Sequence, residues 1–334
     1  MKIFFSILVL SLALVNGWTD APSAIAGCVS TRSLRPRSAL LLAALCNFLG
    51  AVVISLISPS VAKTLYGIAD FGNDGRSALL SLCVALITVI VWATLASLRG
   101  IPTSESHALI SSVCGSALAS NLSLSSIQAK EWNSVILGII ISTVPVAFLS
   151  ALIYKLSSHV FKAQDRRKTM RYFSRVQRIS AGTSCFLHGA QDSQKFIGVY
   201  MLGLTFINGA TKAKEFKIPL PITLSCALAM SLGTFIGGSK IVKKVGCDMT
   251  VLDPLSSSAA DTASSSFLGV CSFLGIPTAT TQAKTCALMG IGLCKKGATN
   301  KKIVLELFFT WFLTFPACAI ASFLLSLLAN AIFL

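Results

Sequence analysis

A short stretch occurs twice in this sequence, first as Gly100-Ile101-Pro102-Thr103 and, 175 positions later, as Gly275-Ile276-Pro277-Thr278. Each copy lies between two apolar runs. Two further pairs of landmarks keep nearly the same spacing: Asp20 and Asp192 are 172 positions apart, and Pro145 and Pro316 are 171 positions apart. Three landmarks in the same order at a nearly constant offset predict an internal repeat, in which the chain consists of two related halves.

The composition around this repeat is that of a membrane protein. Hydrophobic residues make up 54% of the 334 residues and charged residues only 12%, whereas a soluble domain usually has about 25% charged residues. The apolar runs are roughly 20 residues long, which is the length of a helix that crosses a bilayer. Ten such runs can be read, at about 3–27, 38–58, 78–98, 101–120, 133–156, 179–206, 218–238, 257–274, 277–294 and 303–333. We therefore predict an all-α integral membrane protein with no soluble domain.

Positive charge is concentrated in the connections between these runs. The formal net charge of +16 would suggest nucleic-acid binding in a soluble protein, but near the ends of membrane helices lysine and arginine mark the cytoplasmic side. The strongly basic connections are 28–37, 155–178, 239–250 and 295–302. If all four are cytoplasmic, the runs alternate without conflict across a cell membrane, and both termini lie outside. This pattern predicts the lipid bilayer as the partner and predicts no binding of nucleic acid.

The longest basic connection divides the runs into five and five. An odd number of crossings in each half inverts the second half relative to the first. We predict a first transmembrane repeat at 1–156, a basic cytoplasmic linker at 157–178 and a second, inverted repeat at 179–334. Inverted repeats whose helices are broken or re-entrant near the membrane midplane are typical of secondary transporters. Residues 1–15 imitate a secretory signal, but we expect them to remain as an uncleaved first helix.

Polar residues interrupt the first apolar run at Asn16-Gly17-Trp18-Thr19-Asp20-Ala21-Pro22-Ser23. A charge within a membrane helix costs at least about 2.5 kcal/mol, so it normally faces a cavity or an ion. Gly17 and Pro22 are expected to loosen the helix and free carbonyl groups that could coordinate a cation. The alternative is a helix that ends near Trp18 and leaves Asp20 as a solvated cap.

A corresponding polar stretch in the second half reads His188-Gly189-Ala190-Gln191-Asp192-Ser193-Gln194-Lys195. Neither apolar flank is long enough to cross the membrane alone, so we predict one broken span that includes the motif. Asp192 suits a cation, and Lys195 can be neutralised by Asp192 or by an anionic substrate.

The residues after each Gly-Ile-Pro-Thr copy carry hydroxyl groups. The first copy continues as Ser104-Glu105-Ser106-His107 and the second as Ala279-Thr280-Thr281-Gln282. A proline followed by hydroxyl residues and an apolar run indicates the start of a helix, whose free N–H groups and positive dipole end attract anions. Two such starts in inverted halves can converge on one anion. We expect each to lie near the midplane and to pair with the preceding run as a re-entrant hairpin.

These motifs resemble the inorganic phosphate transporter family of phosphate permeases, in its short bacterial form, over essentially the full chain. The resemblance rests on five stretches, which are 16–26 followed by 30–34, 100–110, 188–195, 252–254 and 275–281. It implies import of inorganic phosphate driven by symport of Na⁺ or H⁺, with no cofactor other than a bound Na⁺. A homodimer is a plausible assembly that the sequence leaves open.

The resemblance also implies roles for individual residues. Phosphate would be held by Ser104, Ser106, Thr280, Thr281, Gln194 and Lys195. The coupling cation would be held by Asn16, Asp20, Ser23, Gln191 and Asp192, with Asp20 and Asp192 as the ligands of Na⁺ if sodium is that cation. Three positions depart from the family pattern: Gln191 replaces the usual asparagine, Gln282 the usual histidine, and Glu105 a hydroxyl residue.

The departures leave other functions open. Sulfate is the alternative substrate, because some relatives in the family resemble sulfate permeases. A passive anion channel would also place helix ends at a pore, although it would gain nothing from two buried aspartates. A membrane enzyme that uses His107 or His188 as a base is disfavoured, because no arrangement of catalytic or metal-binding residues accompanies them.

Overall fold

The computed structural model describes residues 1–334 except 73, 102, 211–215, 238, 296–298 and 334, and the described part of the chain is built from helices. The helices of the first half are α1 (Lys2–Thr19), α2 (Pro22–Ser30), α3 (Pro36–Ile57), α4 (Ser60–Tyr66), α5 (Gly75–Leu98), α6 (Glu105–Asn121), α7 (Ala129–Ile141) and α8 (Val144–Val160), with a short 3₁₀ turn at Leu124–Ser126. Most described residues of the predicted apolar runs of this half are helical.

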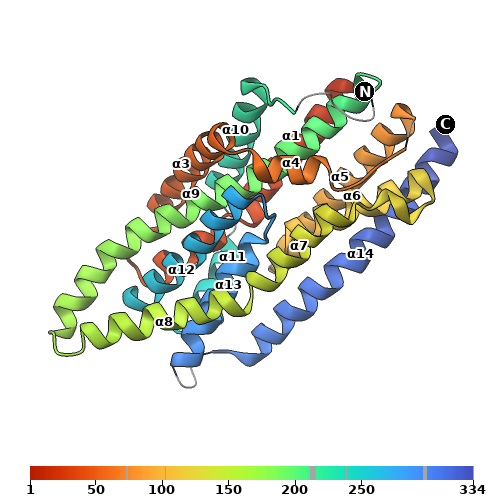
Figure 1. Cartoon of the computed structure of the whole chain (residues 1–334). Coiled ribbons are helices and arrows are strands. Elements are labelled where there is room, and N and C mark those ends of the chain that lie inside the picture. The colour runs from red at the N-terminus through yellow and green to blue at the C-terminus, as the bar shows by residue number, and fades with distance from the viewer. Residues whose placement is uncertain (73, 102, 211–215, 238, 296–298, 334) are drawn as a thin grey trace.

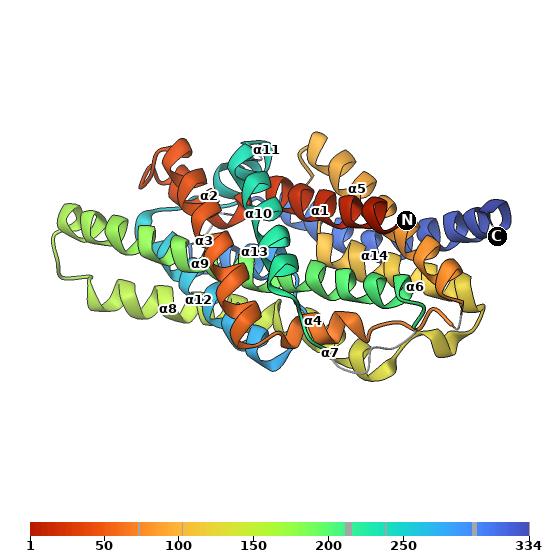
Figure 2. The ribbon, with the colours of Figure 1, turned by 90° about the horizontal axis from the view of Figure 1, so that it is seen from above.

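The second half contains fewer and, at its two ends, longer helices. Its elements are α9 (Arg166–Ile207), α10 (Leu220–Ile236), α11 (Ser239–Lys243), a π-helical turn (Lys244–Asp248), α12 (Pro254–Leu274), α13 (Thr280–Cys294) and α14 (Lys301–Phe333). The two termini lie at one end of the molecule and the α8–α9 turn lies at the opposite end, as both views show (Figures 1 and 2). The pairs α5–α6 and α12–α13 pack as hairpins, in agreement with the sequence.

The outer surface is apolar, as the bilayer requires. Along α3, exposed leucines recur at Leu41, Leu45 and Leu49, every fourth residue and therefore on one helical face. Within the described residues, five helical segments are long and apolar enough to cross a membrane: 2–30, 36–57, 75–98, 129–160 and 301–333. The chain is therefore an all-α integral membrane protein.

Two of the predicted runs are interrupted in the structure. The first is split at Asp20, where α1 ends and α2 begins with Pro22. The run at 133–156 is split between α7 and α8 immediately before Pro145. In contrast, Pro316 lies inside the continuous helix α14. The prediction that Pro102 marks the start of α6 falls on a residue outside the described ones.

Two predictions for residues 157–195 are wrong. The motif His188–Lys195 does not break its span, because α9 runs without interruption through all eight residues. The basic linker is not a loop, because residues 166–178 form the first turns of this 42-residue helix. Arginine, lysine and glutamine have high helix propensity, and Asp165 caps the helix by accepting a hydrogen bond from the Lys168 amide at 2.8 Å.

Glycines allow the site-bearing helices to approach their neighbours closely. A Cβ atom at Gly17 would lie 1.9 Å from the Met230 carbonyl oxygen on α10, and one at Gly189 would lie 2.2 Å from the Asn47 carbonyl oxygen on α3. Small residues have this role in many membrane helix pairs. The prediction that Gly17 loosens its helix is therefore wrong, because Gly17 lies within α1 and serves packing.

Gly189→Ala is expected to lower the free energy of unfolding by about 1–3 kcal/mol, because the added methyl group forces α3 and α9 apart. The measurement is reversible unfolding in detergent. Gly182→Ala on the same helix is the control, since its Cβ would meet nothing closer than 3.6 Å. Equal stability of the two variants would contradict the packing role of Gly189.

Candidate functional site

The two predicted hydroxyl-bearing turns meet inside the molecule. Ser104 is the N-cap of α6, and its hydroxyl accepts a hydrogen bond from the His107 amide at 3.3 Å. Ala279 is the N-cap of α13 and provides no side-chain cap. The Ser106 hydroxyl donates to the Thr278 carbonyl oxygen at 3.3 Å, which joins the two turns directly. Two helix N-termini from opposite halves of the sequence therefore face one buried region.

A lysine from α9 lies between these helix starts. The Lys195 ammonium group donates to Asp192 Oδ1 at 2.5 Å, to the Ser106 hydroxyl at 2.5 Å and to the Thr278 carbonyl oxygen at 2.6 Å. All three donors of the ammonium group are used. Because only 1% of this side chain is exposed, its charge must be compensated locally, and Asp192 provides that compensation. Lys195 thus connects α9 to both turns.

The two aspartates of the repeated motifs lie beside each other. The Thr280 hydroxyl contacts Asp192 Oδ2 at 3.1 Å and Asp20 Oδ2 at 3.4 Å. Asp192 Oδ2 also lies 3.4 Å from the Asn16 amide nitrogen and 3.4 Å from His188 Nε2. Ligand atoms of Asp20, His188 and Asp192 all fall within 4.8 Å of one another. Asp20, at the break between α1 and α2, therefore lies beside the middle of α9.

Several buried oxygen atoms at this site have no hydrogen-bond partner. They are Asn16 Oδ1, Asp20 Oδ1, Glu105 Oε2 and Gln191 Oε1. An unpaired buried acceptor is costly, whereas a hard cation such as Na⁺ or Mg²⁺ binds to oxygen ligands. Asp20, Asp192 and Glu105 also place three carboxyl groups around the single ammonium group of Lys195. The chemistry of these groups suits a cation.

Glu105 is the side chain least anticipated by the family pattern. It is buried in the first turn of α6, and one of its carboxylate oxygens accepts a hydrogen bond from the Thr19 hydroxyl on α1. The sequence identified Glu105 as a departure but did not indicate its contact with Thr19.

Other predicted site residues lie around this centre. The Gln191 amide donates to the Ile276 carbonyl oxygen at 3.3 Å, next to the second turn. Thr281 is buried, and its hydroxyl has no partner. Ser23 is buried in the first turn of α2. These positions are compatible with the predicted roles but do not test them.

The side-chain oxygen of Gln194 is bound by the start of α4. Its side-chain oxygen accepts hydrogen bonds from the amides of Val61 at 3.0 Å and Ala62 at 3.3 Å, both in the first turn of α4. Because α9 is a continuous helix, Gln194 points about 100° away from Lys195. Gln194 therefore stabilises the start of α4 through its oxygen, while its side-chain nitrogen has no hydrogen-bond partner among the described residues. Its role in phosphate binding stays a prediction.

A second buried charge pair was missed by the sequence analysis. Lys284 on α13 forms an ion pair with Asp261 on α12, and both side chains are at most 3% exposed. The Ser180 hydroxyl on α9 donates to Asp261 at 3.4 Å. Asp261 was visible as an acid in a weakly apolar run, but nothing in the sequence pointed to Lys284 as its partner.

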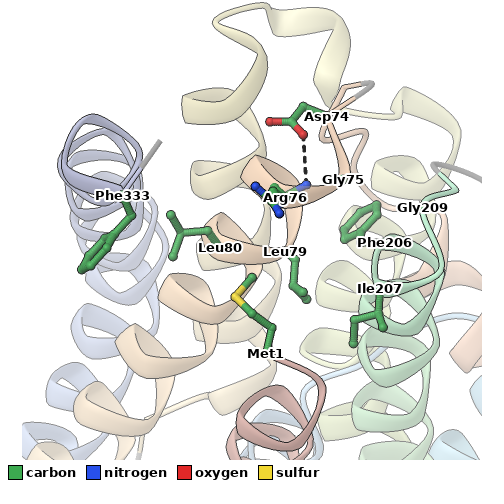
Figure 3. Close-up of a pocket in the computed structure, with 10 residues that line it drawn as sticks. All are labelled: Met1, Asp74, Gly75, Arg76, Leu79, Leu80, Phe206, Ile207, Gly209 and Phe333. Atoms are coloured by element: carbon green, nitrogen blue, oxygen red, sulfur yellow. Dashed lines mark hydrogen bonds between the residues drawn. The ribbon is translucent and has the colours of Figure 1, made fainter.

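A large surface pocket lies away from these groups. It has a volume of about 820 Å³ and lies between α5, the end of α9 and both termini. Figure 3 shows that apolar side chains such as Met1, Leu79 and Ile207 surround it, while Asp74 accepts a hydrogen bond from the Arg76 amide at 3.1 Å. An apolar pocket at the membrane-facing rim suits a lipid chain rather than an inorganic ion. The buried polar centre remains the candidate site.

Comparisons with known proteins show which family the sequence resembles. The sequence matches the model of the phosphate transporter family twice, over residues 16–168 and 157–322. It is 30% identical to a probable low-affinity inorganic phosphate transporter of Bacillus subtilis, over 100% of this chain and 98% of the relative. A protein of the same description from Rhizobium meliloti is 33% identical over 92% of this chain and 90% of the relative.

The fold is also similar to a solved structure. A chain described as the sodium-dependent phosphate transporter superimposes with a TM-score of 0.91 and covers 99% of both chains, at 21% sequence identity. At that identity the likeness establishes the shared fold. The arrangement of helices described above is therefore that of a known fold.

Proposed function

This chain belongs to the phosphate transporter family, and from that premise we propose that it imports inorganic phosphate by symport with a cation, Na⁺ or H⁺. Membership makes the chain a transporter and not an enzyme. The observation that carries the proposal is the buried meeting of two helix N-termini around Lys195, because backbone N–H groups, hydroxyl groups and an ammonium group together form an anion site.

The anion would bind beside Lys195. The start of α13 has no side-chain cap, so its first N–H groups are available to an anion's oxygen atoms. The hydroxyl groups of Ser106, Thr280 and Thr281 add donors on both sides. Phosphate oxygens would accept the hydrogen bonds that the Lys195 ammonium group now donates to the Ser106 hydroxyl and the Thr278 carbonyl oxygen. Ser104, which caps α6, would hold that helix start in position.

The cation would bind on the acidic side of the same centre. Asp20, Asp192 and Glu105 carry up to three negative charges against the single charge of Lys195, and a bound anion would add more. A cation that enters with the anion balances this excess, which gives a physical reason for coupling the two. The unpartnered oxygens of Asn16, Asp20 and Gln191 favour Na⁺ as that cation, since they are hard ligands.

Alternating access would come from movement of the two predicted repeats. Helices of one half pack on helices of the other half. In this way α3 packs on α9 and α10 on α1, while α14 packs on α6 and α8 on α13. Gly115 meets Ala319 in one such pair, and Gly290 meets Ala147 in the other. These reciprocal contacts support an inverted repeat with the site at its centre. The basic α8–α9 turn would be cytoplasmic and both termini outside, while a homodimer remains a prediction.

Transport in proteoliposomes tests the proposal. Labelled phosphate is expected to accumulate against its gradient when an inward Na⁺ or proton gradient is imposed, each applied separately. If neither gradient drives accumulation and phosphate only equilibrates, a passive channel would be favoured. Uptake of sulfate in preference to phosphate would make the chain a sulfate permease.

Phosphate is expected to be preferred over sulfate by at least about tenfold, which requires about 1.4 kcal/mol. Near neutral pH phosphate still carries a proton, and its O–H can donate to Glu105, Asp20 or Asp192, whereas sulfate only accepts hydrogen bonds. The buried Glu105 oxygen without a partner is the acceptor we propose for that proton. Sulfate facing an unpaired carboxylate would lose binding energy.

Competition experiments measure this preference. Equimolar sulfate is expected to leave phosphate uptake almost unchanged, and Glu105→Gln is expected to reduce the discrimination because the amide can also donate to sulfate. If equimolar sulfate halves uptake by the unaltered protein, the discrimination is absent. If Glu105→Gln keeps the full preference, the acceptor is one of the aspartates.

A further inference from the structure

A second polar pocket lies at the end of the molecule opposite the termini. It has a volume of about 310 Å³ and lies where the end of α8, the α8–α9 turn, the first turns of α9 and the start of α12 meet. Its lining includes none of the residues of the buried centre. In the orientation proposed above, this pocket opens to the cytoplasm.

The chemistry of the pocket suits an anion. Lys162 and Arg166 line it, and the segment 162–168 contains four basic residues against the single acid Asp165. The N-terminus of α9 adds its positive dipole end. Asp165 is occupied as the helix cap, because its carboxylate accepts from the Lys168 amide at 2.8 Å. The backbone N–H groups of Arg166 and Arg167 lie in the same first turn, before the Lys168 N–H group that Asp165 binds.

A buried hydroxyl group gives independent support for a ligand. Thr169 is 5% exposed and lines the pocket, and its hydroxyl has no hydrogen-bond partner in the described structure. A buried hydroxyl without a partner is uncommon in proteins, because it loses its hydrogen bonds to water without replacing them. A ligand oxygen in the pocket would provide the missing partner. Ser158, also in the lining, offers a second hydroxyl group.

Asp253 also lines the pocket, and its negative charge is balanced by an ion pair with Lys295. The Asp253 carboxylate accepts from Lys295 Nζ at 2.6 Å and from the Ser256 amide at 2.8 Å. Partial burial opposes its ionisation, but these hydrogen bonds outweigh burial and hold the pKa of Asp253 below its ordinary value. Lys295 therefore faces a carboxylate that stays charged, and the pair adds no net repulsion toward an anion.

The remaining walls are apolar and aromatic. Tyr154, Phe161, Met170 and Leu255 line the pocket beside the basic residues. A bare inorganic ion would leave these walls without contacts, whereas a phosphate group attached to an organic part would use both kinds of surface. The volume is at the lower end of the range for small-molecule sites.

We propose that this pocket binds an organic phosphate through a phosphomonoester group, held by Lys162, Arg166 and the Thr169 hydroxyl, with the organic part against Phe161 and Leu255. The ligand would be either a soluble phosphomonoester or the headgroup of a phosphomonoester lipid. Bound there, it joins the α8–α9 turn to the start of α12. Because α12 leads into the turn that contains Thr278, the pocket is placed to modulate transport.

Binding is tested on the purified full-length protein in nanodiscs of zwitterionic lipid, with adenosine 5′-monophosphate as the soluble probe. In a second arm, native mass spectrometry measures retention of phosphatidic acid after exchange from mixed nanodiscs. Lys162→Gln/Arg166→Gln is expected to weaken binding of the responding probe by at least about tenfold, and Thr169→Val by about threefold to tenfold. Arg167→Gln/Arg171→Gln removes the same charge from exposed positions of α9 and is expected to change binding less than about twofold.

The two arms separate the sources of the phosphate group. Binding of adenosine monophosphate that depends on these residues identifies a soluble ligand, and retention of phosphatidic acid with the same dependence identifies a lipid. The proposal is overturned if neither probe binds, if the control pair weakens binding as much as the pocket pair, or if Thr169→Val has no effect. The assay requires no transport, so its outcome is independent of the proposed phosphate import.

Discussion

Asp20→Asn is expected to abolish concentrative phosphate uptake, with accumulation falling at least about 100-fold, which corresponds to about 2.7 kcal/mol. Asparagine keeps the volume of the side chain and one carbonyl oxygen, so the contact with the Thr280 hydroxyl can persist. It removes the negative charge that the coupling cation needs. In the part of the chain that the structure describes, Asp20 forms no salt bridge, so its neutralisation leaves no unpaired lysine and the fold should be retained.

The measurement is accumulation of labelled phosphate in proteoliposomes with an imposed cation gradient. Asp248→Asn is the matched control, because the same change at an exposed aspartate should leave uptake intact. Unfolding is monitored in parallel, so that loss of coupling is separated from loss of structure. Normal accumulation by folded Asp20→Asn protein would exclude Asp20 as a ligand of the coupling cation.

Lys195→Met is expected to abolish uptake and also to lower the free energy of unfolding by about 3–5 kcal/mol. Methionine keeps the length of the side chain but removes the ammonium group that compensates Asp192 at 2.5 Å. The variant therefore leaves a buried carboxylate without its partner. It also removes the cation that lies between the two helix starts, so the anion site loses its charge.

The double variant Asp192→Asn/Lys195→Met separates these two effects. With both charges removed, the free energy of unfolding is expected to return to within about 1 kcal/mol of the unaltered protein, while uptake remains absent. Lys63→Met on α4 is the control for an exposed lysine. Additive destabilisation in the double variant would show that the two side chains do not act as a pair, and recovered uptake would exclude both from the transport site.

Asp192→Asn alone gives a less direct test than Asp20→Asn. From the sequence, the two aspartates look equivalent, and neutralising either should leave the protein folded. In the structure only Asp192 compensates Lys195, so Asp192→Asn should destabilise the protein as well as prevent uptake. The difference arises because α9 is continuous, which places Lys195 one helical turn after Asp192.

Much of the site could be predicted because its residues occur in local motifs. The repeated Gly-Ile-Pro-Thr stretches identified the helix starts at Ser104 and Ala279, and the interrupted first run identified Asp20. The prediction that His188–Lys195 breaks the helix was wrong, because α9 is continuous there. In a helix, His188, Asp192 and Lys195 share one face, and Gln194 projects about 100° from Lys195, toward α4.

The sequence by itself determined the class of protein and the approximate positions of most helices, and it predicted a repeat and the groups of the candidate site, because each depends on local composition or spacing. Only the tertiary structure decided which partners these groups have. Thr19 contacts Glu105, and Lys284 pairs with Asp261, across distances in sequence that no local pattern spans. The physical reason is that these contacts depend on how closely the backbones of distant helices approach, as at Gly17 and Gly189, and on which face of each helix is buried by that approach.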